Sequence, residues 1–335
     1  MFQLSQIQFD ITNGCNMSCN HCRNGKIAPQ EIENLTLQQC KQLLDEAKSL
    51  GCEWVNISGG EPLLHKDVYE IISYASDKAK VILLTNGYLV DKEVARKLKN
   101  SNVTLVQISL DSSVPDKHDK LRNKKGTYNQ VIRAVHALQD VGIEVCFMVT
   151  LSKINYHEFI PILDIADKEG VSFVNFRRLI SQGNGSDNYD ELSLSKYEIK
   201  EFLATAKKYE NKYAIGICLF PFYFLKDEVE RKQYLKHKSE APTGGCSAGV
   251  FGLAISNNGD ILLCPHIPIA LGNIKKNSLT EVWSNNPMVL SLRDRSNLKG
   301  KCGKCNFNNI CGGCRAYPYQ ITGDIFGEDD FCTEF

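Results

Sequence analysis

The fold of this chain is decided near its start by QFDITNGCNMSCNHC (residues 8–22). Its first residues predict a strand over 8–12, and Cys15, Cys19 and Cys22 follow in the loop after that strand. Three thiolates leave one iron of an iron–sulfur cluster without a protein ligand, and that iron can bind a further molecule. A zinc site is the alternative, although zinc prefers four ligands. The spacing therefore indicates an iron–sulfur site that works on a bound molecule.

Around this motif, short β-branched runs alternate with longer stretches of helical period up to about residue 210. Six strands are predicted over residues 8–12, 54–58, 80–85, 105–110, 144–150 and 172–177. Helices are predicted over residues 40–50, 68–78, 92–99, 128–141, 156–168 and 194–209. Thr36 and Gln39 fit a capping box before the first of these, and Gly51 fits its C-terminal cap. Six βα units predict an α/β fold, a partial (β/α)6 TIM-like barrel with its site at the C-terminal strand ends.

Beyond residue 212 the periodicity weakens, and Gly, Asn, Lys and Cys become frequent. We expect a barrel over residues 1–212, a linker over 213–245 and a loop-rich domain over 246–335. A loop-rich domain that small needs stabilisation beyond its hydrophobic core, and its seven cysteines indicate that bound metal provides it.

Bulk properties exclude several classes of protein. The 39 basic and 39 acidic residues cancel, so no net field favours nucleic acid or a membrane surface. No signal peptide and no apolar run long enough to span a bilayer is evident, which predicts a cytoplasmic protein. In a reducing compartment, 14 cysteines favour metal or redox chemistry over disulfides.

The C-x3-C-x2-C motif after the first strand resembles that of the radical S-adenosylmethionine (SAM) superfamily. SGGEP (residues 58–62) ends the second strand and is similar to the segment that receives the methionyl amino group of SAM in that family. The resemblance implies that the cofactor-binding residues are Gly59, Gly60, Glu61, Asn86, Ser109 and Arg122. For Asn86 and Ser109 ordinary strand-end turns are the alternative, and for Arg122 a solvated helix start. The implied reaction is reductive cleavage of SAM to a 5′-deoxyadenosyl radical, which abstracts a hydrogen atom.

The later cysteines resemble the SPASM extension of the same superfamily, which holds auxiliary [4Fe–4S] clusters. The candidate ligands are Cys246, Cys264, Cys302, Cys305, Cys311, Cys314 and Cys332. The family commonly has three residues where this chain has Gly312 and Gly313. By the family's interleaved pattern, Cys302, Cys305, Cys311 and Cys332 complete one cluster, and the other three supply a second. That second cluster has either an open iron or a further ligand such as His266. A zinc ribbon would separate its halves by about 15–20 residues, not by five.

Two classes of substrate follow from this resemblance. We expect first a peptide or protein, including ribosomally made peptides that are crosslinked, epimerised or oxidised. Such a substrate would either need a separate recognition protein or carry no leader. The alternative is a tetrapyrrole side chain, because CGGCRAY (residues 311–317) also resembles haem-pathway enzymes. A non-enzymatic iron–sulfur or zinc protein is a further alternative. The enzyme would need an electron donor such as flavodoxin or ferredoxin.

No acid, base or hydrogen-atom donor stands out from the sequence. Cys218 and Asp111 are the weak catalytic candidates, and His65, His118 and His266 are expected to be structural or solvated. The remaining cysteines, Cys40, Cys52 and Cys146, are expected in the core.

Overall fold

A computed structural model describes residues 2–25, 33–218, 220–223, 228–236 and 241–332. Its described strands form one ten-stranded sheet in the order β10-β9-β8-β1-β2-β3-β4-β5-β6-β7. The strands are β1 (Gln6–Thr12), β2 (Trp54–Gly59), β3 (Lys80–Thr85), β4 (Leu105–Ser109), β5 (Glu144–Leu151), β6 (Phe173–Arg178), β7 (Ile215–Cys218), β8 (Gly252–Ile255), β9 (Asp260–Cys264) and β10 (Ile267–Asn273). Strands β1 to β7 pair in parallel, so their C-terminal ends share one edge.

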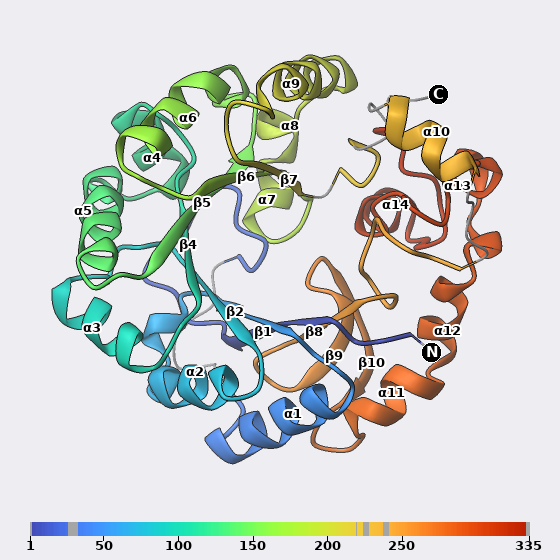
Figure 1. Cartoon of the computed structure of the whole chain (residues 1–335), viewed down its shortest axis with the longest axis horizontal. Helices are drawn as coiled ribbons and strands as arrows, with labels where there is room; N and C mark the ends of the chain where they lie inside the picture. Colours follow the sequence, from blue (N-terminus) through green and yellow to red (C-terminus); the bar gives the residue numbers. More distant parts are fainter. Residues whose placement is uncertain (1, 26–32, 219, 224–227, 237–240, 333–335) are drawn as a thin grey trace.

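Helices surround the outside of this curved sheet, as Figure 1 shows. They are α1 (Leu37–Ser49), α2 (Val68–Ser76), α3 (Lys92–Asn100), α4 (Pro115–Arg122), α5 (Thr127–Gln139), α6 (Phe159–Lys168), α7 (Asn184–Asp187), α8 (Tyr189–Leu192) and α9 (Lys196–Tyr209). All six predicted strands and all six predicted helices are confirmed. The capping box of Thr36 and Gln39 is present, and Gly51 follows α1 with a left-handed φ of 88°. The sequence did not predict α4, α7 and α8.

The two faces of the sheet differ in chemistry because side chains alternate along each strand. Ile57, Leu83, Val106 and Phe147 are fully buried or nearly so in the apolar core. The alternate positions on β2, β4, β5 and β6 carry polar side chains, among them Ser58, Gln107, Ser109, Thr150 and Asn175. The apolar face stabilises the barrel under its helices, and the polar face surrounds a space inside it.

The C-terminal region continues the sheet. β8 pairs in parallel with β1, and β8, β9 and β10 then form an antiparallel ribbon. The later helices are α10 (Glu228–Lys236), α11 (Leu279–Asn285), α12 (Pro287–Arg293), α13 (Gly300–Lys304) and α14 (Ala316–Thr322). In Figure 1 these orange-to-red segments occupy the side on which the ring of strands is open. The domain boundaries stay a prediction, and the segment expected as a linker contributes β7.

No helix in the described part of the chain is both long and apolar enough to span a bilayer.

Candidate active site

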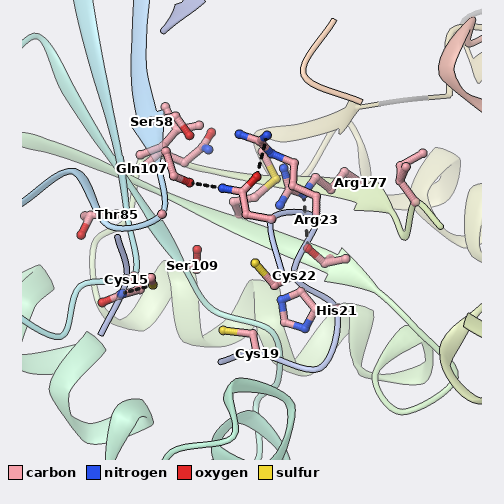
Figure 2. A pocket seen from close by; sticks show the side chains of 18 of the residues that line it. Cys15, Cys19, His21, Cys22, Arg23, Ser58, Thr85, Gln107, Ser109 and Arg177 are labelled. Atoms are coloured by element: carbon pink, nitrogen blue, oxygen red, sulfur yellow. Dashed lines mark hydrogen bonds between the residues drawn. The ribbon is translucent and has the colours of Figure 1, made fainter. Parts of the chain in front are cut away.

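A hollow of about 940 Å³, counting the solvent at its mouth, lies at the C-terminal ends of the parallel strands. Cys15, Cys19 and Cys22, in the loop after β1, all line this hollow and are shown with their neighbours in Figure 2. Of the predicted cofactor-binding residues, Gly59, Gly60, Asn86, Ser109 and Arg122 line it as well. The structure therefore brings together side chains from β1, β2, β3, β4 and α4 that are far apart in sequence.

The loop that carries the three thiols is held by close backbone contacts to the end of β2. Gly59 has a φ of 141°, and a Cβ there would lie 2.1 Å from the Thr12 carbonyl oxygen. A Cβ on Gly60 would lie 2.3 Å from the Gly14 carbonyl oxygen. Both distances are far below van der Waals contact, so only glycine fits. These two glycines allow the backbone after β2 to pack directly against the start of the thiol loop.

Glu61 is the one predicted cofactor-binding residue that does not line the hollow. Its fully buried carboxylate accepts hydrogen bonds from the Thr85 hydroxyl, the Asn86 backbone N–H and the Leu63 N–H, at 2.8, 2.8 and 3.2 Å. Burial raises the pKa of this carboxyl, and the three donors oppose that shift. In this structure Glu61 joins the ends of β2 and β3, and its binding to SAM stays a prediction.

Asn86 and Ser109 lie at the ends of β3 and β4 with different surroundings. The Asn86 amide donates to Asn16 Oδ1 at 2.8 Å and lies 4.0 Å from Cys15 Sγ, so it holds the thiol loop. The Ser109 hydroxyl has no hydrogen-bond partner among the described residues, although it lines the hollow. Ser109 is thus the more available of the two to a bound molecule.

Arg122 and Asp111 form a buried ion pair with 2.6 Å between Nη2 and Oδ2. The Asp111 carboxylate also accepts from the Thr150 N–H at 2.9 Å, and His21 Nε2 lies 3.4 Å from it. Burial raises the pKa of this carboxyl, but Arg122 and the neighbouring imidazoles outweigh that effect and hold it at about 2. A group that stays charged and does not line the hollow is poorly suited to acid–base catalysis.

Arg122 is therefore already paired with a carboxylate of its own chain. Its Nη1 also lies 3.8 Å from Cys19 Sγ, while its Nε is buried without a partner. The alternative of a solvated helix start is wrong, because Arg122 is only 8% exposed. Binding of the SAM carboxylate by Arg122 stays a prediction.

The histidines named from the sequence are buried. His118 Nδ1 accepts the Asp111 backbone N–H at 3.1 Å, which requires a neutral ring. Burial and Arg122 lower the pKa of His118 to about 4. His65 Nδ1 accepts the Asp67 N–H at 3.1 Å and so closes a local turn. Both act as structural acceptors.

Hydrogen bonds between the thiol loop and the segment 184–188, which contains α7, were not predicted from the sequence. The Asn184 amide donates to the Cys19 carbonyl at 3.0 Å, and the Asn188 amide donates to the Asn20 carbonyl at 3.1 Å. The Gly185 N–H donates to the Cys22 carbonyl at 3.1 Å. These contacts cross more than 160 residues of chain, and sequence periodicity carries no signal for them.

Arginines on the wall of the hollow were also missed. Arg23 pairs with Asp10 at 2.6 Å, and Arg178 makes two bonds of 3.1 Å to Asp329. Arg177 on β6 lies beside them, and its Nε donates to the Thr150 hydroxyl at 3.2 Å. The only available signal was the position of Arg177 and Arg178 at the end of a predicted strand.

A second, smaller hollow of about 360 Å³ lies in the C-terminal region. Cys302, Cys305, Cys311 and Cys332, the predicted set of four, line it together. Three of their sulfur atoms accept backbone N–H groups, from Asp329 to Cys302, from Phe307 to Cys305 and from Gly313 to Cys311, at 3.3–3.4 Å. Such N–H donors suit thiolates of an iron–sulfur cluster. The family commonly has three residues where this chain has Gly312 and Gly313, and the four thiols still line one hollow with this shorter spacing.

The other three predicted thiols, Cys246, Cys264 and Cys314, influence one another. Burial and then the charge of Cys246 raise the pKa of the Cys264 thiol. Burial raises the pKa of Cys314, Arg178 opposes that shift, and Cys246 adds to it. His266, two residues after Cys264, lines the large hollow and keeps a buried Nδ1 without a partner. This group of thiols therefore lies beside the wall of the large hollow.

The remaining cysteines belong to none of the three groups of predicted cluster ligands. Cys40, Cys52 and Cys146 are buried, as expected. Cys218 ends β7, and its thiol donates to Asn175 Oδ1 at 3.8 Å. It does not line the large hollow, and its role as a hydrogen-atom donor stays a prediction.

The residues present fit the cofactors that the sequence implies. Burial raises the pKa of the Cys15 thiol to about 12, so this sulfur needs a metal to become a thiolate. Arg122, Arg178 and His266 each line the hollow and each hold a buried nitrogen without a partner among the described residues. Buried polar atoms without a partner on the wall of a hollow suit a polar ligand.

Two family models match the chain. The radical SAM superfamily model matches residues 9–166, and the SPASM model, described as an iron–sulfur cluster-binding domain, matches residues 246–306. The second match favours iron–sulfur clusters over the zinc alternative.

Curated relatives of two kinds match almost the whole chain. An AdoMet-dependent heme synthase of Methanosarcina barkeri is 32% identical over 97% of this chain and 95% of its own length. The mycofactocin maturase MftC of Mycolicibacterium smegmatis is 29% identical over 98% of this chain and 82% of its own.

Among solved structures, SuiB of Streptococcus suis bound to S-adenosylmethionine matches with a TM-score of 0.77. The match covers 99% of this chain and 77% of that chain at 19% identity, and at that identity it shows the fold.

Proposed function

The chain belongs to the radical SAM superfamily and carries a SPASM domain, and from this premise we propose that it oxidises a tetrapyrrole side chain. It is an enzyme whose cofactors are SAM, a [4Fe–4S] cluster and auxiliary iron–sulfur clusters. One observation carries the proposal. Cys15, Cys19 and Cys22 line the same hollow as His266 and Arg178, which adjoin the group of Cys246, Cys264 and Cys314.

A substrate in this hollow lies between two groups of thiols. Within the proposal Cys15, Cys19 and Cys22 hold the SAM-binding cluster, and Cys246, Cys264 and Cys314 hold an auxiliary one. When bound, these groups supply a hydrogen-abstracting radical and one-electron redox capacity. Loss of a hydrogen atom leaves a substrate with one unpaired electron, and an oxidation must pass that electron on. A three-thiol group beside the substrate supports an oxidation over an isomerisation.

The chain's own residues position the reactants. The backbone at Gly59 and Gly60 and the amide of Asn86 hold the thiol loop, and the Ser109 hydroxyl is available to bind SAM. Asp111 keeps Arg122 in place beside Cys19.

The tetrapyrrole class is supported by the relative that matches at 32% identity along both chains. A propionate side chain could lose carbon dioxide, one hydrogen atom and one electron to become a vinyl group. The sequence alone favoured a peptide substrate. We place the tetrapyrrole first because the likeness to the heme synthase has the higher identity and covers more of the relative than the likeness to MftC does.

A peptide is the second candidate. The likeness to MftC, at 29% identity over 98% of the chain, supports it. Such a substrate would either need a separate recognition protein or carry no leader, as expected from the sequence.

The test uses the reconstituted protein under anaerobic conditions with SAM and a reductant. We expect 5′-deoxyadenosine to form, and an added iron tetrapyrrole with propionate side chains to lose carbon dioxide and two hydrogens by mass spectrometry. Formation of 5′-deoxyadenosine with an unchanged tetrapyrrole would overturn the substrate class. Turnover of a peptide encoded beside the gene would then establish the second candidate.

A further inference from the structure

The charges around the large hollow are unbalanced. Arginines 23, 122, 177 and 178 line it, whereas no described Asp or Glu does so. Three of these guanidinium groups have a carboxylate partner just behind the wall, in Asp10, Asp111 and Asp329. Arg177 has no carboxylate within ion-pair distance among the described residues. The wall therefore presents one uncompensated positive charge.

Arg177 is held so that its charged end faces the hollow. It lies in register with Thr150 on β5 and Cys218 on β7, on the polar face of the sheet. The bond from its Nε to the Thr150 hydroxyl leaves both amino groups without a partner in the described structure. Figure 2 shows Arg177 and Arg23 close together on one side of the hollow.

The surroundings of Arg177 disfavour its charge. Burial and then the charge of Arg23 lower its pKa, although a guanidinium stays protonated in proteins. An anion placed between the two guanidinium groups would relieve both effects. A carboxylate suits this place because the planar fork of arginine can bind its two oxygens together.

The other arginines also differ from Arg177 in their thiol neighbours. Arg23 is influenced by Cys22 and Cys264, Arg122 by Cys19, and Arg178 by Cys314, all of them predicted cluster ligands. The thiol that most affects Arg177 is Cys218, which is not a predicted ligand. Arg23, Arg122 and Arg178 can therefore be explained by the negative charge of neighbouring cluster thiolates. Arg177 cannot be explained in this way.

We propose that Arg177, with Arg23 beside it, binds a carboxylate group of the substrate and so selects substrates that are carboxylic acids. The inference rests on the proposed function, in which a substrate occupies this hollow. The residues expected to bind SAM lie at the ends of β2, β3 and β4 and on α4, whereas Arg177 lies on β6. The carboxylate is therefore assigned to the substrate and not to the methionyl end of SAM.

The experiment compares ligands that differ only in this group. A fluorescent metal-free porphyrin with propionate side chains and its methyl ester form one pair, and a peptide with a free C-terminal carboxylate and its amide form the other. Dissociation constants are measured by fluorescence titration and calorimetry on the reconstituted protein with SAM bound. The proteins are wild type, Arg177→Gln, Arg177→Lys and the control Arg133→Gln, whose side chain is exposed on α5.

We expect wild type to prefer the acid of the pair it binds by about tenfold or more, as loss of a charge-assisted pair implies. Arg177→Gln should abolish that preference, Arg177→Lys should keep part of it, and Arg133→Gln should keep it all. SAM affinity and iron content should match wild type in all three variants.

Three results would overturn the inference: equal binding of acid and neutral forms in wild type, an unchanged preference in Arg177→Gln, or a selective loss of SAM affinity in that variant. An acid preference seen only with the peptide pair would uphold the role of Arg177 while it refutes the tetrapyrrole proposal. The two proposals can therefore fail separately.

Discussion

The two thiol-lined hollows in the described part of this molecule differ in the chemistry of their walls. The large one, about 940 Å³, has three predicted cluster thiols on its wall together with arginines, hydroxyls and amides. The small one, about 360 Å³, has four thiols, two glycines and few other polar groups. Four thiols can complete the protein ligation of one cluster, whereas three cannot. The comparison suggests that the small hollow is built to hold a cluster and the large one to exchange molecules.

Glycines serve the two places differently. At the small hollow Gly313 has a φ of 59°, and a Cβ there would lie 3.1 Å from Cys302 Sγ. The chain therefore wraps closely around the thiols themselves. At the large hollow Gly59 and Gly60 press against the backbone of the thiol loop and leave the space in front of the thiols open.

The largest difference between the two hollows is expected when one thiol is removed from each in turn. Cys19→Ala should abolish 5′-deoxyadenosine formation, because the cluster that faces SAM needs all three ligands. Cys305→Ala should retain formation of 5′-deoxyadenosine and lose product formation and thermal stability, since metal binding there contributes to folding. Iron content and 5′-deoxyadenosine, measured by chromatography, report both outcomes.

Cys40→Ala is the control for this pair, because Cys40 is buried in α1 and is no predicted ligand. It should keep the full iron content. Equal loss of SAM cleavage in Cys19→Ala and Cys305→Ala would mean that the two hollows do not divide the work as proposed.

A smaller effect is expected from the ion pair behind the large hollow. Asp111→Asn keeps the shape of the side chain but leaves Arg122 as a buried charge without a partner. Breaking such a pair costs about 3–5 kcal/mol, and SAM cleavage should fall as Arg122 shifts beside Cys19. Thermal unfolding and the rate of 5′-deoxyadenosine formation measure the two consequences.

The exposed pair of Asp45 and Lys78 offers a matched control. Asp45→Asn should change neither stability nor activity appreciably, because solvent screens that pair. If both variants behaved alike, the charged wall of the large hollow would have no special importance.

The smallest effect concerns pH. Burial and Arg122 lower the pKa of His118 to about 4, against an ordinary value of 6.5. Between these values the unfolded chain binds more protons than the folded one, so wild type loses stability as the pH falls through this window. In His118→Asn the amide oxygen can still accept the Asp111 N–H but cannot titrate. The drop in unfolding temperature from pH 7.5 to 5.5 should therefore be smaller in the variant.

His21 should still contribute part of that loss in the variant, because burial lowers its pKa to about 4 as well. An identical drop in wild type and His118→Asn would show that His118 does not titrate in this range.

The sequence predicted the barrel well because its signals are local. The capping box at Thr36 and Gln39 and the alternation along strands such as 80–85 depend on neighbours within a few residues. The group of Cys302, Cys305, Cys311 and Cys332 was found by its resemblance to a family. The uncompensated charge of Arg177 could not be found in either way, because it depends on which carboxylates lie behind the wall in three dimensions.

The parallel pairing of β8 with β1 has a consequence for the synthesis of this protein. β1 leaves the ribosome well before its partner over residues 252–255, because β2 to β7 and their helices lie between the two in the chain. Until then one edge of β1 is open, and the loop with Cys15, Cys19 and Cys22 follows directly from it. Final assembly of the first thiol site therefore waits for the C-terminal strands, so a truncated or stalled chain would not present a finished site for cluster insertion.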